Sequence, residues 1–352
     1  MSSNSSIEWT DATWNPVRGC SIVSKGCTNC YAMKFAHRFS GAGKAFDGLT
    51  MLSKAGPVWN GKIMLVPDVL GQPLRWRRGR RIFVNSMSDL FHEDVPFEFI
   101  ASVFAIMGVT TRHTYQILTK RPERMVEFFE WAHKERGAHE FAADDKILQH
   151  WPKDIPWDGY DNCGPLYPYE NVHIGVSIED QSSADKRIKL LKQIPAAVRW
   201  LSMEPLLENT DIQDLEGGDN ALATIRVEPG EYGEGVEFPC KPDIDWVVIG
   251  GESGPGARPF NIEWARTILR DCRHAGVPCF VKQLGSRPHG NCSKCNGKGY
   301  CHTGSDPDWC EKCGGAQYEF LNLKDTKGGD ITEWPEDLRV REFPNQPIPE
   351  TA

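Results

Sequence analysis

Short apolar segments that alternate with helical patterns most constrain the fold of this 352-residue chain. The segments are nearly continuously apolar and rich in Val and Ile, which is typical of parallel strands buried on both faces. We expect these strands at 13–19, 81–86, 114–119, 172–178, 199–203, 245–250 and 278–283. Helical patterns occupy the intervals 97–108, 122–135, 182–193 and 262–275. The alternation predicts an α/β fold with a parallel sheet and right-handed crossovers.

The number of these units predicts a partial barrel. Six or seven β/α units are too few to close an eight-stranded barrel, so we expect a partial (β/α) barrel with about six parallel strands. Three segments look like inserted loops, since they lack periodicity and carry many turn residues. These loops are expected at about 40–81, 139–169 and 211–242.

Polar residues gather where the expected strands end. In (β/α) barrels, the carboxyl ends of the strands build the active site. The residues at or just after these ends are Asn85, Ser88, Asp89, Lys120, Ser177, Glu179, Glu204, Glu252, Lys282 and Gln283. A polar residue leaving a strand also suits an ordinary wet loop, and the repetition over six strands favours a site.

Composition and charge limit the cellular compartments and partners that suit the protein. No stretch approaches the roughly 20 apolar residues needed to span a bilayer, and the amino-terminal residues lack the pattern of a signal peptide. We therefore expect a cytoplasmic protein without membrane contact, in a compartment where thiols stay reduced. The net charge of −8 argues against a generally basic coat for nucleic acid, though a local basic groove remains compatible with it.

The cysteines are concentrated in two short windows. Of the 12 cysteines, three lie at Cys20, Cys27 and Cys30, and five lie between residues 292 and 313. In a reducing compartment, such bunching indicates metal binding far more often than disulfides.

Cys20, Cys27 and Cys30 favour an iron–sulfur cluster, because such clusters are held by Cys thiolates. Three protein ligands on a 4Fe-4S cluster would leave one iron open for an exchangeable ligand. Two alternatives stay open: a zinc knuckle that takes a fourth ligand such as His37, and ordinary buried thiols.

The spacing resembles that of the radical S-adenosylmethionine (radical SAM) enzymes. Their usual signature is C-x3-C-x2-C, whereas this chain has C-x6-C-x2-C followed by the aromatic Tyr31. In such enzymes the open iron binds S-adenosylmethionine, and an electron from the cluster generates a 5′-deoxyadenosyl radical. The longer first spacing leaves room for an iron–sulfur enzyme that does not use this cofactor.

A string of sequence blocks resembles the phage-associated three-cysteine-motif family, a radical-SAM-like and mostly uncharacterised group. The blocks are IEWTDATWN at 7–15, the cysteine segment 19–31, FVNSMSDLFHEDVP at 83–96, QILTKRP at 116–122, NVHIGVSIE at 171–179, WLSMEP at 200–205, WVVIGGESGPGARP at 246–259, FVKQLG at 280–285 and KGGDITEWPEDLRVR at 327–341. The resemblance implies a partial barrel with a 4Fe-4S cluster on Cys20, Cys27 and Cys30 and S-adenosylmethionine as cofactor. It also implies a phage protein, in that case located in the host-cell cytoplasm.

The resemblance also implies roles for single residues. Asn85, Ser86 and Asp89 would lie near the methionine amine, Ser177 and Glu179 near the ribose, and the backbone of Gly250 and Gly251 near the adenine or the substrate. Glu204, Lys282 and Glu252 are the candidate catalytic or substrate-contacting residues.

The second window forms the pattern C-x2-C-x14-C-x2-C with Cys292, Cys295, Cys310 and Cys313. Paired CxxC turns that supply four thiolates are typical of a structural Zn²⁺ site. An auxiliary iron–sulfur cluster is the alternative, and Cys301 and His302 are possible substitute ligands. We expect a partial barrel over 1–285, a zinc-knuckle insert over 286–320, and a tail over 321–352 that packs back on the barrel.

One arginine-rich run adds a possible partner. Five arginines and Trp76 lie between Arg75 and Arg81, and such a run can contact phosphates and stack on bases, or can simply be a solvated basic turn. The favoured hypothesis is a radical SAM enzyme acting on a nucleic-acid base or nucleotide in DNA modification or repair, with a reductase or flavodoxin-type electron donor. A metal-stapled nucleic-acid-binding or regulatory protein without catalysis is the alternative.

Overall fold

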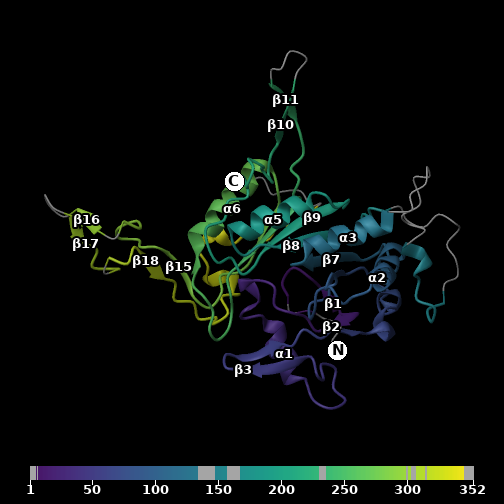
Figure 1. Ribbon diagram of the computed structural model, residues 1–352. Coiled ribbons are helices and arrows are strands. Elements are labelled where there is room, and N and C mark those ends of the chain that lie inside the picture. The colour runs from purple at the N-terminus through teal and green to yellow at the C-terminus, as the bar shows by residue number, and fades with distance from the viewer. Residues whose placement is uncertain are drawn as a thin grey trace. The chain divides into compact units, whose positions relative to one another are not determined.

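A computed structural model (Figure 1) describes residues 5, 7–133, 147–156, 167–229, 235–298, 300–302, 307–313 and 315–344. Its main feature is a seven-stranded sheet in the order β1-β6-β7-β8-β9-β12-β14. The strands are β1 (Ala12–Trp14), β6 (Arg81–Val84), β7 (Thr114–Thr119), β8 (Val172–Ser177), β9 (Val198–Met203), β12 (Trp246–Gly250) and β14 (Cys279–Gln283). Neighbours pair in parallel, as β1 does with β6, β7 with β8 and β12 with β14. The predicted α/β class and the open, partial barrel are confirmed, with seven strands instead of about six.

Four of the five helices with described bounds follow the predicted intervals, and α1 was not predicted. They are α1 (Tyr31–Arg38), α2 (Phe97–Val109), α3 (Pro122–His133), α5 (Gln181–Leu191) and α6 (Ile262–Ala275). The ends of α6 illustrate the local code: Asn261 accepts a hydrogen bond from the backbone of Glu263 at the start, and Gly276 ends the helix in the left-handed conformation. The strands β8 and β12 are buried along their whole length, as their unbroken apolar character requires.

The expected strand at 13–19 was wrong in its length. It is broken into β1 and a separate β2 (Val17–Arg18), which pairs antiparallel with β5 (Met64–Leu65). Pro16 lies between the two strands, and a proline offers no N–H to a sheet ladder.

The expected inserted loops hold some structure of their own. The segment 40–81 contains the antiparallel hairpin β3 (Thr50–Ser53) and β4 (Gly56–Trp59), and the segment 211–242 contains the hairpin β10 (Ile225–Pro229) and β11 (Gly235–Pro239). In the segment 139–169, residues 139–146 and 157–166 lie outside the described residues.

The chain divides into two compact units. Unit 1 comprises Met1–Ser177 with Lys186–Leu201, and unit 2 comprises Ile178–Asp185 with Ser202–Ala352. Within the described part of the chain, no helix is both long and apolar enough to cross a membrane.

Unit 2 carries a small lobe beyond α6. The strand β15 (Pro288–Asn291) pairs with β13 (Phe260–Asn261) and antiparallel with β18 (Tyr318–Phe320). A further hairpin, β16 (Tyr300–His302) with β17 (Pro307–Trp309), lies between β15 and β18 in the chain and is seen beyond them in Figure 1.

Candidate metal centres and the residues around them

The three cysteines of the first window lie on one loop of unit 1. Cys20 follows β2, Cys27 ends the short 3-10 helix η1 (Lys25–Cys27), and Cys30 is the residue before α1. All three are free and partly exposed. Gly19 has a φ of +87°, and a Cβ there would lie 2.3 Å from the carbonyl oxygen of Lys62, so only glycine fits at the entry to this loop.

The thiols of this loop act on one another electrostatically. Burial raises the pKa of Cys20 to about 12, the charge of Asp89 adds to this, and Arg121 opposes it. Burial also raises the pKa of Cys30, and the nearby Cys27 acts in the same direction. Without a bound metal ion the thiols of Cys20 and Cys30 therefore stay protonated, whereas a bound metal ion would displace these protons.

Arg121 joins the cysteine loop to the sheet. Its guanidinium donates to Cys20 Sγ at 3.7 Å, to Ser21 Oγ at 2.6 Å and to Glu93 at 2.8 Å. It also forms an ion pair of 3.1 Å with Asp89, and both side chains are buried. Burial alone would lower the pKa of Arg121, but Asp89, Cys20 and Glu93 raise it above its ordinary value, so the guanidinium stays charged.

Arg121 was missed as a site residue, although it lies in the QILTKRP block. Neither its burial nor its partners could be inferred from local pattern, since Cys20 lies about a hundred positions away. His92, the other polar residue near this loop, is buried, with Nε2 lying 3.1 Å from Ser21 Oγ.

Asn85, a predicted cofactor residue, lies at the end of β6 in unit 1. Its φ is +60°, and its Oδ1 accepts a hydrogen bond from the backbone of Val17. Its Nδ2 is buried and has no hydrogen-bond partner among the described residues. On β7, Gln116 Oε1 is buried and equally unpartnered within the described part of the chain. Buried polar groups are costly when unpaired, so both atoms suit a bound ligand or water.

Ser86 and Asp89 are already engaged by the protein. Ser86 Oγ donates to Asn15 at 3.2 Å, and the carbonyl oxygen of Ser86 accepts from the Tyr31 hydroxyl. The Asp89 carboxylate accepts from Thr119 Oγ1 at 2.8 Å as well as from Arg121. These bonds fix the loop after β6, and the predicted contacts of both residues with a cofactor stay predictions.

The predicted ribose-contacting residues lie at the end of β8 and just after it. Ser177 is buried, and its carbonyl oxygen accepts from Arg187 at 2.6 Å. The Glu179 side chain is also buried, while its backbone N–H donates to Ser183. These bonds reveal no ligand-binding role, so this prediction also stays open.

In unit 2, Glu204 and Lys282 lie together. Lys282 Nζ is 3.2 Å from Glu204 Oε1, and both side chains are mostly buried. A Cβ at Gly250 would lie 2.4 Å from the same carboxylate oxygen, so the glycine makes room for Glu204. Gly251 is similarly confined, since a Cβ there would lie 2.4 Å from the carbonyl oxygen of Leu284.

Arg258 already occupies both carboxylate oxygens of Glu252 within unit 2. Its carboxylate accepts from Arg258 Nη2 at 2.8 Å, Nε at 3.1 Å and the backbone N–H at 2.9 Å. Such a two-pronged ion pair fixes a loop well. Among the predicted catalytic residues, Glu204 and Lys282 are the two that form an ion pair with each other.

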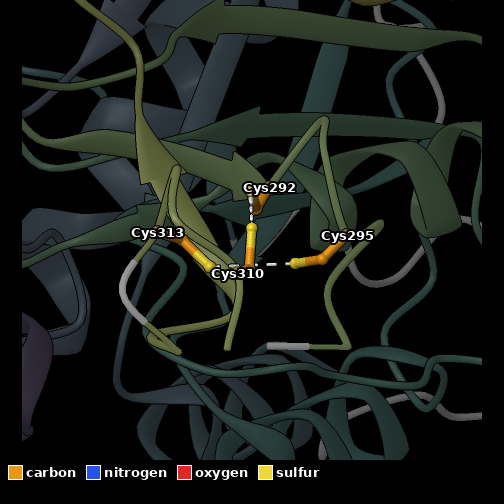
Figure 2. Close-up of side chains that lie close together, drawn as sticks. All are labelled: Cys292, Cys295, Cys310 and Cys313. Carbon is orange, nitrogen blue, oxygen red and sulfur yellow. Dashed lines mark hydrogen bonds between the residues drawn. The ribbon is translucent and has the colours of Figure 1, made fainter. Parts of the chain in front are cut away.

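The four cysteines of the second window converge at one point of unit 2. Figure 2 shows the sulfur atoms of Cys292, Cys295, Cys310 and Cys313 turned toward one another. Their ligand atoms all lie within 4.8 Å of one another, and the pairs Cys292–Cys310 and Cys295–Cys313 are both separated by 3.7 Å. A tetrahedral ion with metal–sulfur distances of about 2.3 Å requires sulfur–sulfur separations of about 3.8 Å. The four thiols thus have the spacing of ligands to a single tetrahedral ion.

The lobe of unit 2 builds this site from backbone turns. Pairing of β15 with β18 brings the two CxxC turns together, and Cys292 donates its N–H to Gln317 O. Although burial acts to raise it, the backbone N–H groups of Cys313 and Lys312 lower the pKa of Cys310 to about 6. The side chains of the possible substitute ligands Cys301 and His302 lie outside the described residues.

Comparison with known proteins gives one family and one recurring structural likeness. A family model described as "Protein of unknown function (DUF5131)" matches residues 4–311. No curated protein sequence matches the chain. Among solved structures, spore photoproduct lyase complexed with dinucleoside spore photoproduct is similar at 12% identity and a TM-score of 0.38, over 79% of this chain and 77% of that one. A variant of the same lyase gives 12% identity and a TM-score of 0.37, over 80% and 78% of the two chains.

Proposed function

For this chain, which belongs to the DUF5131 family, we propose a radical SAM enzyme with its catalytic cluster on Cys20, Cys27 and Cys30. The observation that carries the proposal is a set of three free, partly exposed thiols on one loop beside the buried Arg121. Thiolates are the usual ligands of iron–sulfur clusters, and three of them leave one corner of a 4Fe-4S cluster for another ligand. When bound, the cluster would supply the electron that cleaves S-adenosylmethionine and yields a 5′-deoxyadenosyl radical.

The chain's own residues would hold and orient these groups. Arg121 opposes the rise in the pKa of Cys20, which would ease loss of its proton to a metal, and it fixes the loop against Asp89. The unpartnered Nδ2 of Asn85 offers a donor to a carboxylate or hydroxyl oxygen of the cofactor. In unit 2, Lys282 and Glu204 form an ion pair of 3.2 Å and are the proposed substrate-contacting residues.

The substrate class in this proposal is a nucleic-acid base or nucleotide, in a modification or repair reaction. A reductase or a flavodoxin-type protein would supply the electron. The reducing cytoplasm is the proposed setting, since it keeps these thiols free, and the phage association stays a prediction from the sequence blocks.

For the second cysteine site we propose structural Zn²⁺. The 3.7 Å separations fit one tetrahedral ion, whereas the thiolates of a 4Fe-4S cluster bind four different irons and must lie farther apart.

Anaerobic reconstitution tests the proposed activity. With iron and sulfide, the protein should bind about four irons at the three-cysteine site, and reduction with S-adenosylmethionine should release 5′-deoxyadenosine. Cys30→Ala should lose both the bound iron and the deoxyadenosine. Cys240→Ala is the matched control, because Cys240 is a partly exposed thiol of unit 2 outside both clusters.

A second candidate function is a metal-stapled binding protein without catalysis, favoured by the complete geometry of the four-cysteine site. This second function is favoured if the reconstituted protein binds zinc alone and releases no deoxyadenosine. A reconstituted cluster without deoxyadenosine would instead favour an iron–sulfur enzyme of another kind.

A further inference from the structure

A pocket in unit 1 has none of the three cysteines of the first window in its lining. Its volume is about 390 Å³, within the range of small-molecule sites. One wall comes from β1 and β2, with Thr13, Asn15 and Arg18. The other wall comes from the turns after β5, with Val69 and the residues 72, 75 and 76. Trp14 ties the two walls together by donating its Nε1 to Val69 O at 2.8 Å.

The charged side chains lining this pocket are both arginines. Arg18 donates from Nη1 to Ala45 O at 3.2 Å, and its guanidinium lies 5.7 Å from the centre of the Phe46 ring. Its Nε is buried and has no hydrogen-bond partner within the described ranges. Arg75, the second arginine, is exposed. Two guanidinium groups without a lining carboxylate suit a phosphate, whose oxygens accept from their planar donors.

The third feature of the pocket is an indole held in place. Arg112 donates from Nε to the carbonyl oxygen of Trp76 at 2.8 Å, and His113 meets the Trp76 ring edge-on at 5.9 Å. Arg80 lies 5.1 Å from the centre of the ring. A fixed, partly exposed indole is a surface on which a nucleic-acid base stacks.

The polar groups of the walls complete the set. Gln72 brings a carboxamide, which both donates and accepts hydrogen bonds and suits the edge of a base. The Asn15 carboxamide shapes the wall instead, since its Oδ1 already accepts from Ser86 Oγ and the backbone N–H of Met87. Beyond the pocket, Arg77 and Arg78 are exposed and continue the basic surface of a chain that is otherwise acidic. A single nucleotide would not need these further arginines, whereas a strand with successive phosphates would use them.

We propose that this pocket binds one nucleotide of a single-stranded nucleic acid, with its phosphate on Arg18 and Arg75 and its base against Trp76. This inference rests on the proposed function for its substrate class and assigns the residues that recognise it. It also explains why the arginine run carries a tryptophan.

The test is direct binding of a fluorescein-labelled oligothymidylate of about 12 nucleotides, a length within the usual site sizes, followed by fluorescence anisotropy. The full chain is used without iron and without S-adenosylmethionine, so that binding is measured independently of the cluster. Trp76→Ala and Arg75→Ala should each weaken binding about tenfold, as expected for the loss of one stacked base or one phosphate contact. Arg75 is exposed, so its variant should keep the melting temperature of the wild type.

Arg270→Ala is the control, because Arg270 is an exposed arginine of unit 2 outside the pocket. Unchanged binding by both pocket variants, or an equal loss with Arg270→Ala, would overturn the proposal. Thymidine monophosphate that competes as well as the oligonucleotide would overturn the assignment to a strand. Loss of binding in Trp76→Ala supports the pocket even if the protein never releases deoxyadenosine. If Trp76→Ala keeps its binding while the protein does release deoxyadenosine, the pocket is refuted and the proposed function stands.

Discussion

At the scale of single residues, Asp89 and Arg121 hold the cysteine loop in unit 1. Their ion pair of 3.1 Å is buried, and Asp89 also accepts from Thr119 and from the backbone of Lys120. Buried charges are tolerated only when they are paired and hydrogen-bonded. The pair therefore explains why a charged arginine can lie against a thiol that is a candidate metal ligand.

Asp89→Asn should lower the free energy of unfolding by about 3 kcal/mol, because among the described residues it leaves the buried guanidinium of Arg121 with the exposed Glu93 as its one carboxylate partner. Urea denaturation measures the change. Glu127→Gln, which removes an exposed partner of Arg124, should cost less than about 0.5 kcal/mol. Equal effects of the two substitutions would contradict this account of the loop.

His92 makes stability depend on pH. Burial, followed by the charge of Arg121, lowers the pKa of His92 below its ordinary value, and Asp94 donates its backbone N–H to Nδ1. The folded protein then binds fewer protons than the unfolded chain, so the free energy of unfolding should fall as the pH drops below about 6.5.

Urea denaturation between about pH 5 and pH 8 checks this slope. His92→Gln should flatten it, whereas the same change at the exposed His274 should leave it in place. A slope that persists in His92→Gln would assign the pH dependence to other groups.

At the scale of elements, the edge strand β14 of unit 2 is covered by residues 340–342. Val281 donates its N–H to Val340 O, and Glu342 donates to Cys279 O. Trp334 anchors this segment, since it is fully buried and donates its Nε1 to Gly328 O at 3.1 Å. An uncovered edge strand is a template for aggregation, so this segment protects the sheet.

Trp334→Ala should lower the free energy of unfolding by about 3–5 kcal/mol through the cavity that it leaves. It should also raise the fraction of aggregate on size-exclusion chromatography, because β14 becomes exposed. Phe320→Ala, at an exposed aromatic of unit 2, should change the free energy of unfolding by less than about 1 kcal/mol. A monomeric Trp334→Ala of wild-type stability would show that the segment is dispensable.

At the scale of the whole molecule, each candidate metal centre draws its ligands from one unit. Cys20, Cys27 and Cys30 belong to unit 1, and the four-cysteine site belongs to unit 2. Metal binding and local folding are coupled within a unit, so loss of one centre should spare the other.

We therefore expect Cys30→Ala to lose iron and keep one zinc per chain, and Cys310→Ala to lose zinc and keep its iron. Elemental analysis after anaerobic reconstitution measures both metals in each variant. Hydrogen exchange should show faster exchange in Cys310→Ala between residues 288 and 320, where β15 and β18 hold the site. Loss of both metals from either variant would show that the two centres depend on each other.

The sequence by itself determined the class of fold and the grouping of the four cysteines in the second window. Strand and helix patterns depend on neighbours a few residues apart. For this reason the strands β6, β7, β8, β9, β12 and β14 and the helices α2, α3, α5 and α6 could be predicted to within a few residues. The spacing C-x2-C-x14-C-x2-C is local as well, and it correctly grouped Cys292, Cys295, Cys310 and Cys313. Pro16 indicated the break between β1 and β2, but the apolar pattern of the segment favoured one continuous strand.

Only the tertiary structure decided which distant residues meet. Arg121 reaches Cys20 across about a hundred positions. Arg18 and Trp76 line the same pocket, although the β3–β4 hairpin lies between them in the chain. Partners of this kind depend on how the sheet twists and how loops return, which no local pattern encodes. The same holds for Glu204, whose place beside Lys282 and Gly250 requires three strands to be packed before the pair exists.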